Sequence, residues 1–87
     1  MSIDAVTGLD REELRDLLAQ TLDADAAEIR DDADFVEALE VDSLMALEVV
    51  VVLERRYGVR FAEAEMRSVR TLDSAYELVR QKLRERP

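Results

Sequence analysis

A single serine is the residue of this chain whose setting points most directly to covalent chemistry. Ser43 lies between Asp42 and Leu44, near the front of the apolar segment EVDSLMALEVVVVLERRYG, residues 40–58. The chain has no cysteine and no histidine, so it lacks a thiolate nucleophile, an imidazole base and the commonest metal ligands. Aspartate, glutamate, tyrosine and serine remain, but no base or metal activates them. The composition therefore argues against an enzyme and predicts no metal site.

The segment around this serine predicts a helix that runs from Asp42 or Ser43 to Tyr57. Gly58 follows it at the position where helices commonly end in a left-handed residue. Two arginines in the last predicted turn would complement the negative end of the helix dipole. Ser43 is therefore expected at the first turn of a long helix.

Capping is the simplest role for such a serine, because serine and aspartate are ordinary residues at a helix start. The same dipeptide recurs as Asp73 and Ser74 near the start of another predicted helix. Ser43 differs in that an acidic stretch precedes it and apolar residues follow it. A phosphate esterified to Ser43 would be favoured by the free N–H groups and the positive end of the helix. We therefore favour Ser43 over Ser74 as an attachment site.

The predicted helix is apolar on two faces. At 100° per residue one arc is expected to face the core, and it holds Ala46, Val49, Val50, Leu53 and Tyr57. A second stripe lies nearly opposite and consists of Leu44, Leu47 and Val51, bordered by charged residues. Such a stripe is either covered by the preceding loop or exposed to a partner protein, and we favour the partner.

The rest of the chain predicts an all-α single domain of residues 1–87, a small four-helix bundle with three longer helices and one short. The first helix is expected from Asp10, in a capping box with Glu13, to about Thr21. A long, acidic, irregular connection follows over residues 23–41, with Ile29, Phe35, Val36 and Leu39 as inward anchors. A short helix is expected over residues 62–66. The last helix should begin after Thr71 or Asp73 and direct Leu72, Ala75, Tyr76, Val79 and Leu83 inward.

Charge is unevenly distributed along the chain. The net charge is −9, and residues 1–57 hold 16 acids against 5 bases, whereas residues 58–87 hold 5 acids against 7 bases. An acidic surface argues against binding to nucleic acid or to anionic lipid. No apolar run approaches the length of a membrane span, and no signal segment is evident at the N-terminus. We therefore expect a cytoplasmic monomer that binds neither nucleic acid nor membrane.

The segments FVEALEVDSLMALEVVVVLERRYGVRF and AEAEMRSVRTLDSAYELV resemble acyl carrier proteins over about residues 10–84. In that family an Asp-Ser-Leu triplet opens the second helix, a glutamate follows the serine by five residues, and an aromatic residue closes the helix. Here these features are Asp42 to Leu44, Glu48 and Tyr57.

The resemblance implies that a separate phosphopantetheinyl transferase attaches 4′-phosphopantetheine from coenzyme A to Ser43, beside Asp42. The thiol of that arm would carry acyl or aminoacyl groups as thioesters. The implied partners are a ketosynthase, an acyltransferase or an acyl or aminoacyl ligase with basic docking surfaces. The implied partner-binding residues are Leu44, Met45, Leu47, Glu48 and Val51.

Two residues depart from the family pattern. Glu40 stands where the family often has glycine. The glutamate stiffens the turn and adds a charge. Met45 stands where carriers of fatty-acid synthesis usually have an acid, and the segment DSLMALE is similar instead to carriers of polyketide and hybrid pathways. We therefore favour a discrete carrier of polyketide or related secondary-metabolite biosynthesis over a housekeeping fatty-acid carrier.

Two readings without a prosthetic group remain open. An acidic helical interaction module would explain the charge and the second apolar stripe, but it gives no reason for the triplet at Ser43. A calcium site in the acidic connection is weaker, because the spacing lacks the glycine and the final glutamate of the usual loop.

Overall fold

The computed structural model describes residues 7–85, apart from the side chain of Ser43. Its helices are α1 (Arg11–Leu22), α2 (Phe35–Ala38), α3 (Ser43–Tyr57), α4 (Glu63–Arg67) and α5 (Leu72–Glu85), with one 3₁₀ turn at Ala26–Glu28. The predicted all-α class is confirmed. No helix in this part of the chain combines the length and the apolar character that crossing a membrane requires.

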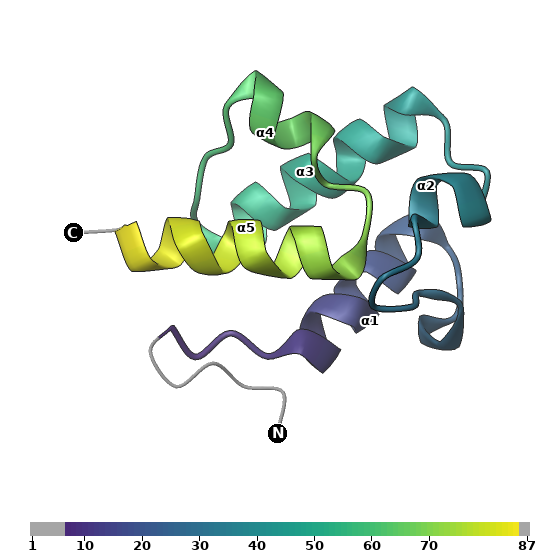
Figure 1. Cartoon of the computed structure of the whole chain (residues 1–87), viewed down its shortest axis with the longest axis horizontal. Helices are drawn as coiled ribbons and strands as arrows, with labels where there is room; N and C mark the ends of the chain where they lie inside the picture. Colours follow the sequence, from purple (N-terminus) through teal and green to yellow (C-terminus); the bar gives the residue numbers. More distant parts are fainter. Residues whose placement is uncertain (1–6, 86–87) are drawn as a thin grey trace.

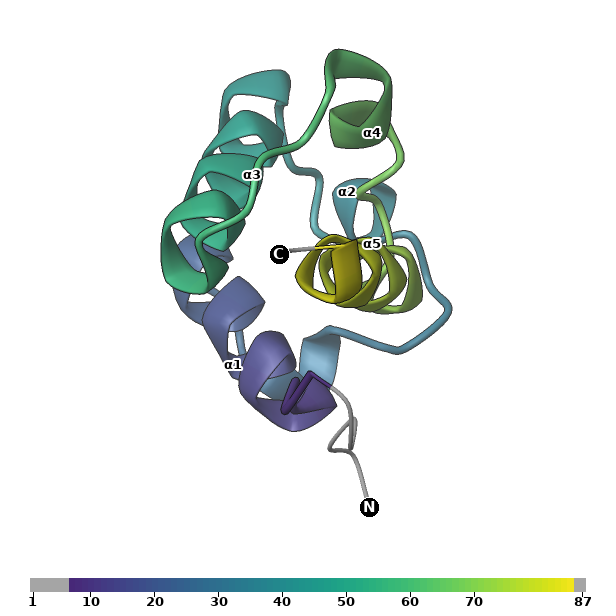
Figure 2. The same ribbon diagram turned by 90° about the vertical axis from the view of Figure 1, so that its left-hand side faces the viewer.

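The three long helices pack against one another around a single core (Figures 1 and 2). Figure 2 shows α5 end-on beside α3 and α1, with the short α4 above it. The most deeply buried side chains come from all three long helices and from the connection: Leu14, Leu18, Ile29, Phe35, Val49, Leu53, Leu72 and Val79. The predicted core face of α3 is thus confirmed at its centre, while Ala46 and Tyr57 lie half-buried at its ends.

The first helix begins as expected, but the predicted capping box is wrong. The carboxylate of Asp10 accepts a hydrogen bond from the backbone N–H of Glu12 at 2.9 Å. Glu13 does not return a bond to the cap among the described contacts, and its carboxylate instead accepts from the Arg56 side chain of α3. A long-range ion pair therefore replaced the local contact that the sequence suggested.

The connection from α1 to α3 was expected to be irregular, and it contains one further short helix, α2. The side chain of Asp34 caps α2 by accepting from the N–H groups of Val36 and Glu37 at 2.9 and 3.1 Å. Of the four expected anchors, Ile29 and Phe35 are fully buried, whereas Val36 and Leu39 are half-buried. The bundle therefore has two short helices beside its three long ones, because packing of Phe35 and the cap at Asp34 stabilise a turn that propensity alone did not indicate.

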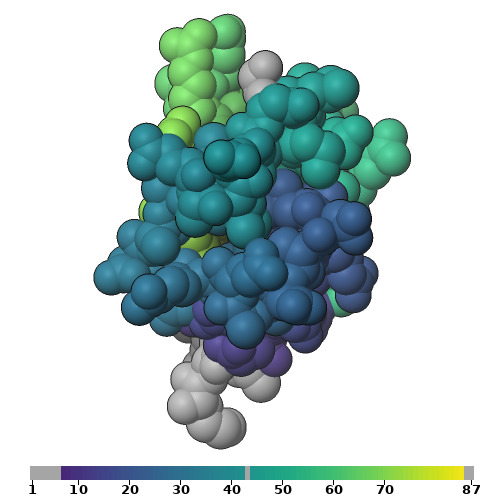
Figure 3. All heavy atoms as spheres, turned by 90° about the vertical axis from the view of Figure 1, so that its right-hand side faces the viewer, coloured from purple at the N-terminus to yellow at the C-terminus, as the bar shows by residue number. Residues whose placement is uncertain are grey.

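Backbone bonds attach this connection to the start of α5. The N–H of Phe35 donates to the carbonyl of Arg70 at 2.8 Å, and the N–H of Asp73 donates to the carbonyl of Asp31 at 2.9 Å. The side chain of Arg15 on α1 also donates to the carbonyl of Ile29. Figure 3 shows the connection spread over one face of the molecule, with α3 beside it.

One residue before α3 and one after it adopt left-handed backbone conformations. Gly58 ends α3 with φ 66°, as expected. Glu40, which precedes α3, has φ 52°, a conformation that costs an ordinary side chain more than it costs glycine. The turn at Glu40 is therefore strained rather than merely stiffened.

Candidate functional site

The start of α3 presents Ser43 as the first helical residue and gives the capping role to its neighbour. Asp42 has an extended backbone, with φ −80° and ψ 173°, and its carboxylate accepts from the N–H of Met45 at 2.8 Å. Aspartate is among the best residues at this position because its side chain satisfies an otherwise unpaired N–H group. The helix start is thus capped by the side chain of Asp42.

The second Asp-Ser pair behaves differently. The hydroxyl of Ser74 accepts from the backbone N–H of Thr71 at 3.0 Å and from that of Arg70 at 3.2 Å. In return, the N–H of Ser74 donates to the hydroxyl of Thr71 at 2.9 Å. Ser74 therefore belongs to a reciprocal cap at the start of α5, with Thr71 as the cap residue, and its hydroxyl is occupied by that structural role.

Downstream of Ser43, α3 carries the exposed apolar stripe that the sequence predicted. Leu44 is 65% exposed, Leu47 49% and Val51 37%. The connection over residues 23–41 therefore does not cover this stripe. Glu48 is exposed beside it, whereas Met45 is half-buried and packs against the core. Four of the five residues that we assigned to partner binding thus share an accessible face, and Met45 is set apart from them.

Acidic side chains surround this end of α3. Asp42 and Glu48 lie on or next to the helix, and Glu37 and Glu40 lie on the connection that leads to it; all four are exposed. None of the four forms an ion pair with another of the described residues, unlike Asp34, which pairs with Arg70. That pairing lowers the pKa of Asp34, chiefly through the hydrogen bond from Arg70. The face beside Ser43 therefore presents unpaired negative charge around an apolar stripe.

A groove of about 430 Å³ begins at Asp42, next to Ser43, and lies between α2, α3 and α4. Its walls are mainly apolar and include Val36, Val41, Ala46, Leu47, Val50, Met66 and Val69. Asp42, Glu63, Arg67 and Arg70 complete its lining. Leu47 therefore lies on the border between the exposed stripe and the groove. The sequence did not reveal this groove, since its lining comes from elements whose relative placement only the fold defines.

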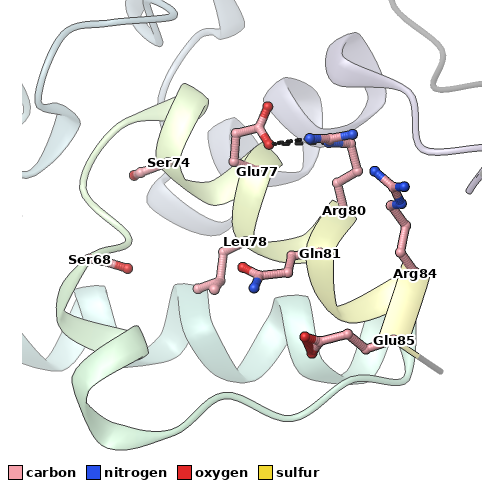
Figure 4. A pocket seen from close by; sticks show the side chains of 8 residues that line it. All are labelled: Ser68, Ser74, Glu77, Leu78, Arg80, Gln81, Arg84 and Glu85. Atoms are coloured by element: carbon pink, nitrogen blue, oxygen red, sulfur yellow. Dashed lines mark hydrogen bonds and ion pairs between the residues drawn. The ribbon is translucent and has the colours of Figure 1, made fainter.

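A larger hollow, of about 660 Å³, lies elsewhere, along α5 and the segment before it (Figure 4). Seven of its eight lining residues are polar, and Leu78 is the exception. The Glu77 carboxylate pairs there with Arg80 of the same helix at 2.7 Å. None of the predicted site residues lines this hollow, so we regard it as a concavity of the polar face of α5.

Comparison with known proteins identifies what the chain is similar to. Residues 12–79, which include Ser43 and all of α3, match the family described as "Phosphopantetheine attachment site". The chain is 60% identical over 77 residues to Polyketide-8 synthase acyl carrier protein 2 of Streptomyces avermitilis, which covers 88% of each chain.

Two further relatives share less of the sequence. The anthracycline acyl carrier protein DpsG of Streptomyces peucetius is 43% identical over 74 residues, or 83% of this chain and 88% of that protein. An acyl carrier protein of Petrotoga mobilis is 29% identical over 72 residues, or 83% of this chain and 85% of that protein.

Proposed function

This chain belongs to the acyl carrier proteins, and we propose that its 4′-phosphopantetheine group is attached to Ser43. The group supplies a terminal thiol that holds acyl groups as thioesters. The chain itself is a carrier and not a catalyst. What its own residues contribute is an attachment point, a surface for partner enzymes and surroundings for the carried chain.

One observation supports Ser43 above Ser74. The carboxylate of Asp42 caps α3, whereas the hydroxyl of Ser74 is itself used to cap α5. A hydroxyl that a transferase must reach has to be free of such bonds. The engagement of the Ser74 hydroxyl in its cap therefore supports attachment at Ser43, the serine of the other Asp-Ser pair.

The start of α3 also fits a phosphodiester. The first turn of the helix itself contains no acidic residue, and the carboxylate of Asp42 at the cap is the nearest acid on the helix. The N–H groups of this turn and the positive end of the helix dipole favour a negative group. The exposed positions of Asp42 and Leu44 on either side leave room for a flexible arm.

The pathway that we propose is polyketide or related secondary-metabolite biosynthesis, with the cytoplasm as its location. Two relatives at 60% and 43% identity are described as carriers of polyketide and anthracycline synthesis, respectively. Met45, in place of an acid, agrees with this choice. The relative at 29% identity is described only as an acyl carrier protein, so a role in fatty-acid synthesis is the alternative.

Partner enzymes are proposed to dock on the face that Leu44, Leu47, Glu48 and Val51 form. Apolar side chains would be buried there, and unpaired acids would attract basic surfaces of a phosphopantetheinyl transferase, a ketosynthase or an acyltransferase. The carried chain is proposed to enter the groove between α2, α3 and α4, because that groove starts at Asp42 and has mainly apolar walls.

Mass spectrometry of the intact protein tests the attachment site. After incubation with coenzyme A and a broad-specificity transferase, the mass should increase by one phosphopantetheine group. Ser43→Ala should abolish the increase, and Ser74→Ala should leave it intact. Modification of the Ser43→Ala variant would show that the arm is carried elsewhere.

A further inference from the structure

The wall of the groove that α4 forms is thinly packed. None of the five residues of α4 is buried, and Met66 is the one among them that packs against the core. The buried anchors of this region, Phe61 and Val69, lie before and after the helix rather than within it. Apolar burial therefore holds the two ends of this segment more firmly than the helix between them.

An ion pair attaches α4 to α5 from the side. The ammonium group of Lys82 on α5 lies 2.8 Å from Oε1 of Glu65 on α4. The same carboxylate oxygen accepts from the N–H of Ala62 at 2.7 Å, at the start of α4. The shared hydrogen bond with Lys82 lowers the pKa of Glu65 and raises that of Lys82. One carboxylate thus supports the start of the helix and its attachment to α5.

The other ion pair of α4 lies within the helix and does not join it to another element. Glu63 and Arg67 pair at 3.1 Å within the helix, with side chains 83% and 79% exposed. By contrast, the side chains of Glu65 and Lys82 are 29% and 22% exposed. The Glu65–Lys82 pair therefore lies nearer the packed surface and is the ion pair of α4, among the described residues, that reaches another helix.

We propose that Lys82 and Glu65 are positioning residues that hold α4 against the bundle as the wall of the groove, and so set how well a carried acyl chain is shielded from water. The proposal rests on the function proposed above for the groove. Glu63, Met66 and Arg67 of α4 line that groove, so a movement of the helix would open it along one side.

Amide hydrogen exchange of the protein without its arm tests the attachment. Lys82→Met removes the ammonium group and keeps the long apolar stem, and Lys82→Arg restores a cation. In Lys82→Met the amides of Met66, Ser68 and Val69 should exchange roughly two- to fivefold faster, the scale expected for the loss of one ion pair at the protein surface. Lys82→Arg should stay close to the unmodified sequence.

A matched control is available on α5 itself. Glu77→Gln disrupts the Glu77–Arg80 pair, which has a length of 2.7 Å but joins no second helix. It should leave exchange in α4 unchanged. If Lys82→Met left amide exchange in α4 unchanged, or accelerated it equally in α3 and α4, the proposal would be overturned. The pair would then have no specific effect on α4.

Hydrolysis of the carried thioester tests the consequence. Octanoyl and acetyl groups are loaded from their coenzyme A esters, and the octanoyl thioester should hydrolyse more slowly because its chain reaches the groove. Lys82→Met should reduce the difference between the two hydrolysis rates, and Glu77→Gln should leave that difference unchanged. If the two thioesters hydrolysed at equal rates on the protein without substitutions, the function proposed for the groove would be contradicted. A difference that Lys82→Met leaves unchanged would instead contradict the positioning role alone.

Discussion

Asp34 and Arg70 join two segments that lie far apart in the sequence. Nε of Arg70 donates to Oδ2 of Asp34 at 2.7 Å, while Oδ1 of the same carboxylate caps α2. Next to this pair, the N–H of Phe35 donates to the carbonyl of Arg70 at 2.8 Å. Because Val36 and Arg70 both line the groove, this pair ties two of its borders together.

Stability at low pH should report on this pair. The hydrogen bond from Arg70 holds the pKa of Asp34 below its ordinary value of 3.8, so Asp34 favours the folded state above that value. This contribution should be lost as the pH falls through the lowered pKa, where the folded protein also takes up the proton. Urea unfolding from neutral to acidic pH should show the loss.

The variant Asp34→Asn isolates the charge, because an asparagine oxygen can still cap α2. It should be less stable than the unmodified protein at neutral pH, and the two should converge once Asp34 is protonated. A constant difference across the whole pH range would show that the charge of Asp34 is not responsible.

Relief of the strained turn should stabilise the protein. Glu40 has φ 52°, and glycine adopts this conformation without the clash that a Cβ atom causes. We expect Glu40→Gly to raise the free energy of unfolding by roughly 0.5 to 1 kcal/mol, since relief of the strain exceeds the added freedom of the unfolded chain. Thermal unfolding measures this, with Glu37→Gly inside α2 as a control that should destabilise. A lower stability for Glu40→Gly would mean that its side chain contributes more than the strain costs.

The two faces of α3 should separate in mutation. Leu53→Ala should cost roughly 2 to 5 kcal/mol of folding stability, because Leu53 is fully buried. Val51→Ala should change stability by less than about 0.5 kcal/mol, as is usual for surface positions. It should instead weaken binding to a partner by roughly 1 kcal/mol at about 25 cal/mol per Å² of buried apolar area, mostly through faster dissociation.

Leu44→Ala serves as a second surface variant, because Leu44 does not line the groove. Leu47 lies on the groove border, so its truncation should affect binding and the groove together. If Val51→Ala unfolded the protein as readily as Leu53→Ala, the separation of the two faces would be wrong.

Charge reversal on α3 should act on the rate of association. Glu48→Lys should slow binding to a transferase with a basic surface and weaken the dependence of that rate on salt, because unpaired acids steer such an encounter. Glu28→Lys makes the same change in net charge at an exposed position on the connection. Stopped-flow measurements at several salt concentrations should show a smaller effect for Glu28→Lys. Equal effects would indicate that net charge alone, and not the position of Glu48, controls association.

The sequence by itself determined the features that depend on neighbours within one or two helical turns. The end of α3 at Tyr57 and its left-handed residue Gly58 follow from residue types at adjacent positions, and so does a start at Asp42 or Ser43, between which the structure assigns the cap to Asp42. The division of α3 into a core face and an exposed stripe follows from its period, and Leu44 and Val51 lie on the exposed side. Ser43 could also be chosen as the candidate attachment site from the sequence, because the residues that distinguish it from Ser74 are its neighbours along the chain.

Only the tertiary structure decided which distant groups meet. Asp34 and Arg70 are 36 positions apart, and Glu13 and Arg56 are 43 apart. The groove, the placement of Met45 and the pair between Glu65 and Lys82 likewise depend on how α4 and α5 pack against α3. Long charged side chains can reach many oppositely charged groups, and local propensity does not favour any one of these partners. Packing of the apolar core fixes the distances between helices, and these distances select the pairs that form.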